Sequence, residues 1–166
     1  MAQIYLIGFM GTGKSTVAKE LARQLHRQVV DTAQVIVERA QMSIAAYFDT
    51  YGEAAFRDLE HQMLEQVSQG KDAIISCGGG VALREDNVAC MKAHGTVFLL
   101  EASPETILKR VRHDHKRPLL KGKKTVEGIT ELMEGRVPFY QAAADYRIAT
   151  DGKSPRMVAR EIQERM

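Results

Sequence analysis

Eight residues near the start of the chain have the types and spacing that bind a polyphosphate. They read Gly8-Phe9-Met10-Gly11-Thr12-Gly13-Lys14-Ser15 and match the pattern G-x-x-x-x-G-K-[ST]. Glycines let the backbone turn so that successive amide N–H groups point inward, and a following helix adds its positive N-terminal end. Lys14 is expected to reach the β- and γ-phosphates of ATP, and the Ser15 hydroxyl to bind Mg²⁺. The residues predicted to bind MgATP are Gly11, Thr12, Gly13, Lys14, Ser15 and Thr16.

The elements on either side of this loop are those that the motif requires. The apolar run Ile4–Ile7 predicts a buried parallel strand, and apolar residues at helical spacing from Val17 to Leu25 predict a helix that begins near Lys14. A glycine-rich turn that matches by chance is the alternative, and the strand and helix beside it argue against that interpretation. The loop recognises phosphates, so alone it does not distinguish a kinase from an ATPase or a GTPase.

Further along the chain, strand patterns alternate with helical ones. Short apolar runs predict four more strands, at residues 29–31, 73–76, 96–100 and 146–149. Helices are expected after the strands at 29–31, 96–100 and 146–149, with Ser43, Ser103-Pro104 and Ser154-Pro155 as N-terminal caps or first turns. Because parallel neighbours need crossover connections, this alternation predicts an α/β fold, a five-stranded parallel sheet flanked by helices. With 166 residues, one P-loop domain over 1–166 is expected.

Composition excludes several classes of function. The chain is 45% hydrophobic and 27% charged, with a net charge of +2, which predicts a compact globular protein without bulk affinity for nucleic acid or membranes. Two cysteines, Cys77 and Cys90, are too few for a disulfide framework and lack zinc-ligand spacing. The first residues lack the basic region and the long apolar core of a signal peptide, so none is expected. We expect a cytoplasmic monomer.

Several separate segments resemble the shikimate kinases, a family in the nucleoside-monophosphate-kinase-like group of P-loop proteins. The resemblance runs over nearly the whole chain. The segments taken together, in this order, are much more specific to the family than any one of them alone. Those segments are Gly8 to Thr16, Asp31-Thr32-Ala33, Gly52-Glu53-Ala54-Ala55-Phe56-Arg57 with Glu60, Cys77-Gly78-Gly79-Gly80-Val81, Arg117-Pro118-Leu119-Leu120 and Arg136-Val137-Pro138-Phe139-Tyr140.

The resemblance implies a transfer of the γ-phosphate of MgATP to the 3-hydroxyl of shikimate, in aromatic amino-acid biosynthesis. It assigns the substrate carboxylate to Arg57 and Arg136, whose planar guanidinium groups suit that contact. It places Glu60 behind Arg57, and it gives the backbone of Gly78, Gly79 and Gly80 a close approach to a cyclic polyol. The alternatives from the residues alone are an exposed helical pair for Arg57 and Glu60 and a flexible strand end for the glycines.

A basic segment follows residue 109. Between Lys109 and Lys124 there are eight Lys or Arg residues against the single acid Asp114. One alternative is a solvated loop. Another is a nucleic-acid contact, but the segment has no interleaved aromatic residues that could stack on bases. The resemblance implies a mobile lid at about 112–124, with Arg117 closing onto the transferred phosphate and Arg110 near the adenine.

One position departs from the family. Where the family has Asp-x-Asp after the second strand, the chain reads Asp31-Thr32-Ala33. The resemblance gives Asp31 a role toward Mg²⁺ and gives position 33 a substrate-binding and catalytic carboxylate. Losing a general base typically costs about 10²- to 10⁴-fold in rate, so we expect an impaired enzyme.

Two explanations of Ala33 remain open, a deliberate Asp-to-Ala substitution and a natural relative with altered function. The other intact segments favour the first. The alternative functions are a kinase of another small acceptor and a nucleotide-binding module without catalysis.

Overall fold

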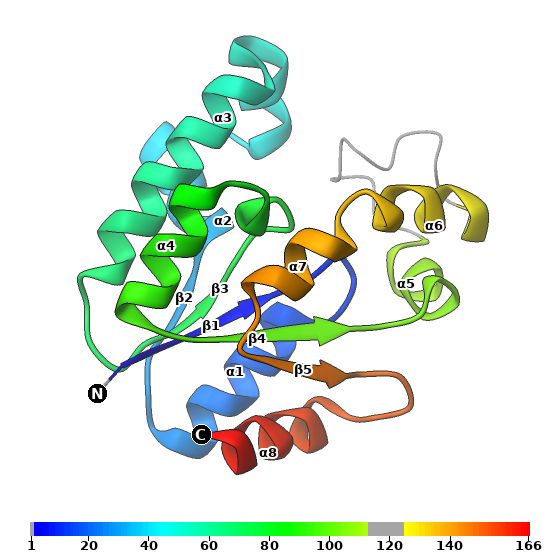
Figure 1. Ribbon diagram of the computed structural model, residues 1–166. Coiled ribbons are helices and arrows are strands. Elements are labelled where there is room, and N and C mark those ends of the chain that lie inside the picture. Colours follow the sequence, from blue (N-terminus) through cyan, green and yellow to red (C-terminus); the bar gives the residue numbers. More distant parts are fainter. Residues whose placement is uncertain (1, 113–124) are drawn as a thin grey trace.

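The computed structural model describes residues 2–112 and 125–166, and it shows alternating strands and helices (Figure 1). The predicted lid, including Arg117, lies outside the described residues except for Arg112. A short 3₁₀ turn, Val81–Leu83, follows the third strand. In chain order the main elements are β1 (Gln3–Ile7), α1 (Lys14–Leu25), β2 (Val29–Asp31), α2 (Thr32–Ala40), α3 (Ile44–Ser68), β3 (Ile74–Ser76), α4 (Glu85–His94), β4 (Gly95–Glu101), α5 (Pro104–Val111), α6 (Val126–Glu134), α7 (Val137–Ala143), β5 (Tyr146–Ala149) and α8 (Pro155–Arg165).

The five strands form one sheet in the order β2-β3-β1-β4-β5, and every pairing in it is parallel. This confirms the predicted fold class. Since all strands run the same way, their carboxyl ends lie at one edge of the sheet. The phosphate-binding loop, the glycine triplet and Thr150 follow strand ends at that edge, and Asp31 is the last residue of β2.

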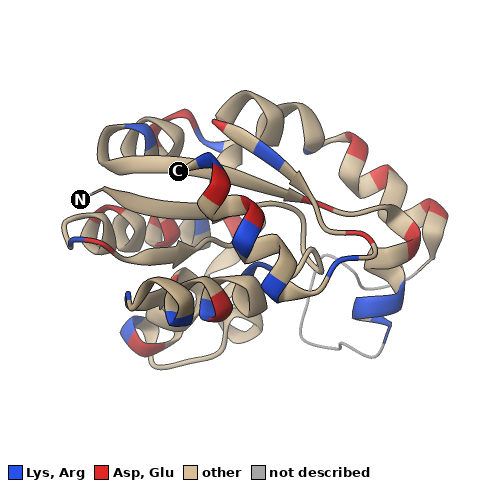
Figure 2. Cartoon of the chain, turned by 90° about the horizontal axis from the view of Figure 1, so that it is seen from below, with Lys and Arg blue, Asp and Glu red and all other residues tan. Residues whose placement is uncertain are grey.

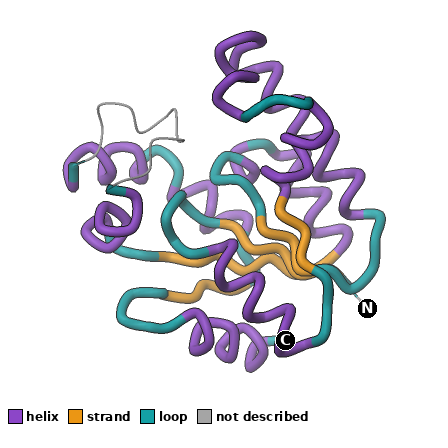
Figure 3. Tube along the Cα trace, turned by 180° about the vertical axis from the view of Figure 1, so that it is seen from behind, coloured by secondary structure: helices purple, strands orange, loops and turns teal. Residues whose placement is uncertain are grey.

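Helices cover both faces of the sheet, as Figures 1 and 3 show. Alternate residues of the strands divide between two cores, because successive side chains of a strand point to opposite faces. On one face, Leu6 and Phe98 pack in a cluster with residues of α1 and α8. On the other, Tyr5 and Leu99 pack with residues of α3, α4, α5, α6 and α7.

Charged residues of both signs are interspersed along the helices, while the strands carry few (Figure 2). No helix in the described part of the chain is both long and apolar enough to cross a membrane.

Candidate active site

The phosphate-binding loop connects the central strand β1 to α1, and its glycines meet steric demands that other residues could not. Gly8, Gly11 and Gly13 have φ values of 148°, 79° and 93°. A Cβ at Gly8 would lie 2.5 Å from the Leu100 carbonyl oxygen, and one at Gly11 would lie 2.9 Å from Val111. Gly13 directly precedes α1. The loop therefore packs tightly against the end of β4 and against α5.

Lys14 lies at the first turn of α1 and folds back over the loop. Its ammonium Nζ donates to the carbonyl oxygens of Gly8 at 2.6 Å and Phe9 at 3.1 Å. The next residue, Ser15, donates from its hydroxyl to Asp31 Oδ2 at 3.0 Å. The Lys14 ammonium and the hydrogen-bonded pair of Ser15 and Asp31 thus lie at the N-terminal end of α1.

Asp31 ends β2 and caps α2. Its Oδ1 accepts from the backbone N–H groups of Ala33 at 2.9 Å and Gln34 at 3.4 Å, which fixes the carboxylate opposite Ser15. Hydroxyl and carboxylate oxygens are ligands that Mg²⁺ prefers. The donor set of Ser15 and Asp31 therefore fits the predicted metal.

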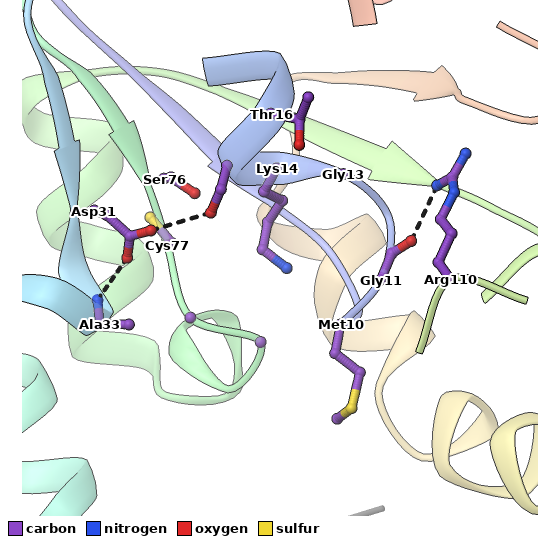
Figure 4. A pocket seen from close by; sticks show the side chains of 13 residues that line it. Met10, Gly11, Gly13, Lys14, Thr16, Asp31, Ala33, Ser76, Cys77 and Arg110 are labelled. Atoms are coloured by element: carbon purple, nitrogen blue, oxygen red, sulfur yellow. Dashed lines mark hydrogen bonds between the residues drawn. The ribbon is translucent and has the colours of Figure 1, made fainter. Parts of the chain in front are cut away.

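These groups surround a cavity of about 480 Å³, shown in Figure 4. Asp31 and Ala33 lie on one side of it, Lys14 lies centrally, and Arg110 comes from the opposite side. The predicted site residues that line it are Gly11, Gly13, Lys14, Ser15, Thr16, Asp31, Ala33, Gly78, Gly79 and Arg110. Elements far apart in sequence thus supply one pocket.

Thr12 does not line this cavity. Its side chain is buried, and its hydroxyl donates to the Phe9 carbonyl oxygen at 2.8 Å, so it stabilises the turn of the loop. Thr12 instead borders an adjoining cavity of about 220 Å³, together with Arg110, Thr150 and Pro155. Gly13, Thr16 and Arg110 line both cavities, so the two spaces lie next to each other.

The glycine triplet lies against three charged side chains. A Cβ at Gly80 would collide with the guanidinium of Arg57, and one at Gly79 would lie 3.2 Å from Nη1 of Arg136. At Gly78 it would lie 2.8 Å from Oε2 of Glu60. The triplet is therefore a packed backbone surface on which two arginines converge.

Arg57 is held by a buried carboxylate. Its Nη1 donates to Glu60 Oε1 at 3.0 Å, and Glu60 has only 2% of its side chain exposed. Burial raises the pKa of Glu60 above its ordinary value, although the neighbouring Arg57 opposes this shift. The interpretation of this pair as an exposed helical ion pair is wrong, because the fold covers Glu60.

Aromatic rings and a tyrosine complete this side of the site. The Arg57 guanidinium lies 5.2 Å from the ring centroid of Phe56, and that of Arg136 lies 6.0 Å from Phe9. The buried Tyr140 donates from its hydroxyl to the Gly79 carbonyl oxygen at 2.6 Å. The sequence does not predict these contacts, and Tyr140 in the Arg-x-Pro-x-Tyr segment is the one signal of them in it.

Ala33 lies in the first turn of α2, at the wall of the 480 Å³ cavity. Among the described residues that line this cavity, Asp31 supplies the one carboxylate. The residue between them, Thr32, is buried, and its hydroxyl donates to the Ser76 carbonyl oxygen and accepts from the Gly78 N–H. Thr32 thereby ties the end of β2 to the glycine triplet.

Comparisons with known proteins agree with this geometry. The family model described as shikimate kinase matches residues 10–166. The shikimate kinase of Persephonella marina is 44% identical over 166 residues, which cover 100% of this chain and 99% of that protein. That of Caldicellulosiruptor saccharolyticus is 41% identical over 162 residues, covering 98% of this chain and 94% of that protein.

Solved structures give the same result. Shikimate kinase from Acinetobacter baumannii in complex with shikimate has a TM-score of 0.94 and 32% identity, covering 99% of this chain and 92% of that one. Shikimate kinase from Aquifex aeolicus has a TM-score of 0.85 and 36% identity, covering 98% and 94%. A family model that spans nearly all of the chain, together with such relatives, places the protein in the shikimate kinase family.

Proposed function

We propose that this protein transfers the γ-phosphate of ATP to the 3-hydroxyl of shikimate, a step of aromatic amino-acid biosynthesis. The observation that carries the proposal is the convergence of Arg57 and Arg136 on the glycine triplet, beside the cavity that contains Lys14. Two guanidinium groups suit a carboxylated acceptor. The Acinetobacter baumannii structure was solved in complex with shikimate, which supports the same acceptor here.

In this proposal the two halves of the site have separate tasks. The loop amides and Lys14 hold the polyphosphate and offset the charge on the transferred group. Ser15 and Asp31 would hold Mg²⁺, which would supply positive charge to offset that of the phosphates. Arg57, held by Glu60, and Arg136 orient the acceptor carboxylate, so that a ring hydroxyl faces the cavity.

The same proposal includes a strongly reduced rate for this chain. The methyl group of Ala33 can neither accept the proton of the attacking hydroxyl nor hold that hydroxyl in place. Asp31, the carboxylate in the cavity, is engaged by Ser15 and by two backbone N–H groups of α2. The expected deficit is about 10²- to 10⁴-fold in turnover.

The first testable prediction is that Ala33→Asp raises shikimate-dependent release of ADP by orders of magnitude. A coupled assay with and without shikimate measures it. Lys14→Ala, combined with Ala33→Asp, is the control that should remove turnover again. If Ala33→Asp gives no increase while both ligands bind, the account of position 33 is wrong.

The alternative functions make different predictions in the same experiment. A kinase of another small acceptor would bind MgATP without binding shikimate in calorimetry. A nucleotide-binding module would bind ATP and show no turnover, even as Ala33→Asp.

A further inference from the structure

A cluster of hydrogen bonds joins the loop after β5 to the start of α5, outside the groups that hold phosphate or acceptor. Asp151 accepts from the Ser103 N–H at 3.1 Å and from the Ser103 hydroxyl at 3.0 Å. It also accepts from the Thr106 hydroxyl. Ser103 is the N-cap of α5, so the carboxylate lies at the positive end of that helix.

The other end of α5 is joined to the same loop and to the phosphate-binding loop. Arg110 donates from Nη1 to the Gly11 carbonyl oxygen at 3.0 Å, seen in Figure 4, and to the Thr150 hydroxyl at 3.3 Å. The Thr150 hydroxyl in turn donates to the Glu101 carbonyl oxygen at 2.9 Å. Thr150 and Asp151 thus hold α5 at both of its ends.

These hydrogen bonds at the two ends of α5 determine the position of the Arg110 side chain. Arg110 borders both the 480 Å³ cavity and the adjoining 220 Å³ cavity, and Thr150 and Lys153 line the second one. The charge of Arg110 also contributes to holding the pKa of Asp151 below its ordinary value, after the larger effect of the Thr106 hydrogen bond. A shift of α5 would move the guanidinium relative to both spaces.

We propose that Asp151 is a positioning residue for nucleotide binding, which acts through α5 by fixing Arg110 against the phosphate-binding loop. This inference rests on the proposed kinase function, because a nucleotide must occupy the two neighbouring cavities. It assigns Asp151 no contact with the nucleotide itself.

The experiment is calorimetry of MgADP and of shikimate, titrated separately into the parent chain and Asp151→Asn. Loss of the charge and of an acceptor is expected to weaken MgADP binding about three- to tenfold and to leave shikimate binding within twofold. Thr106→Val, which removes one donor to the same carboxylate, is expected to weaken MgADP binding in the same direction but less.

Asp145→Asn is the matched control. Asp145 lies at the opposite end of β5, accepts from the Val97 N–H at 2.7 Å and from Lys92 at 2.7 Å, and lines neither cavity. Its replacement should change the melting temperature without weakening MgADP binding. Equal losses of both ligands in Asp151→Asn, or the same loss in Asp145→Asn, would mean that Asp151 is merely structural.

A double-mutant cycle tests the route through Arg110. In the Arg110→Ala background, Asp151→Asn should cause no further loss of MgADP affinity, because the positioned group is gone. Additive losses overturn the proposal. A parent chain that binds no MgADP overturns the kinase function as well, whereas a parent that binds it beside an unaffected Asp151→Asn overturns this inference alone.

Discussion

Gly80 illustrates how a single residue can determine the geometry of the side of the site that we propose for the acceptor. Its φ of −98° is open to any residue, so backbone strain is not the reason for glycine here. The reason is the Arg57 guanidinium, which lies where a Cβ would stand. Because the obstructing atoms end a flexible side chain, an alanine would displace Arg57 and leave the backbone in place.

We therefore predict that Gly80→Ala weakens shikimate binding about tenfold or more, with little change in MgADP binding. The displaced Arg57 would lose its hydrogen bond to Glu60 and leave a buried carboxylate without its partner. Calorimetry with each ligand measures the effect. Gly135→Ala, at a site where the nearest atom would be 3.8 Å from the new Cβ, is the control, and equal losses in both variants would contradict the prediction.

For single residues, the sequence predicts a site made of neighbouring residues well and predicts contacts between distant segments poorly. The phosphate-binding loop is contiguous, so its residue spacing and the strand and helix beside it are enough to predict it. Whether Glu60 is buried depends on elements from across the chain, and Arg57–Glu60 looks like a surface pair until β3 and its glycines are placed beside it. The Tyr140 contact with Gly79 could not be predicted for the same reason.

At the scale of elements, α3 has a sharp kink that shapes the side of the site proposed for the acceptor. Gly52 interrupts the helix with φ 86° and ψ 170°, values open almost solely to glycine. In a straight helix, residues eight apart are separated by about 12 Å along the axis. Here the rings of Phe48 and Phe56 are 4.6 Å apart, and Phe48 lies 5.9 Å from the Arg57 guanidinium.

We predict that Gly52→Ala lowers the free energy of unfolding by about 1–3 kcal/mol, through backbone strain, since a Cβ there would meet nothing within 4 Å. Urea unfolding followed by circular dichroism measures it. Gly70→Ala, near the end of α3 and without a positive φ, should be nearly neutral. Equal stability of the two variants would show that the kink is not strained.

The predicted strands all exist, with ends within one residue of those observed, because short apolar runs between turn residues have few other interpretations. Two helices were missed. In α4 the buried residues are Asn87 and Met91, which is too little apolar pattern to detect. The seven residues of α7 include a proline in the first turn and form a helix because Tyr140 and Ala143 are buried against the sheet.

For the whole molecule, the two-sided core has a consequence for stability in alkali. Tyr5 lies fully buried in the central strand, and burial raises its pKa from 10.0 to about 12. Burial also raises the pKa of Tyr140 and of the Cys77 thiol. The folded protein therefore keeps protons on these groups at a pH at which the unfolded chain has lost them.

The sign of the effect follows from this difference in bound protons. Below pH 10 both states keep the Tyr5 proton and stability is unaffected by it. Between pH 10 and about 12 the unfolded state loses the proton first, so the free energy of unfolding falls, by at most about 1.4 kcal/mol per pH unit from this residue. Urea unfolding from pH 8 to pH 11.5 is expected to show that fall.

Tyr5→Phe separates this titration from simple loss of packing. It removes the hydrogen bond from the Tyr5 hydroxyl to Ser68 at 2.6 Å, so the variant should be less stable at pH 8, yet its stability should fall less steeply above pH 10. Ile75→Val, at the residue paired with Tyr5 in the sheet, is the matched control. It should lower stability by about 0.5–1.5 kcal/mol at every pH and keep the parent's slope. Should Tyr5→Phe and the parent have the same slope above pH 10, ionisation of Tyr5 is not the cause of the fall in stability.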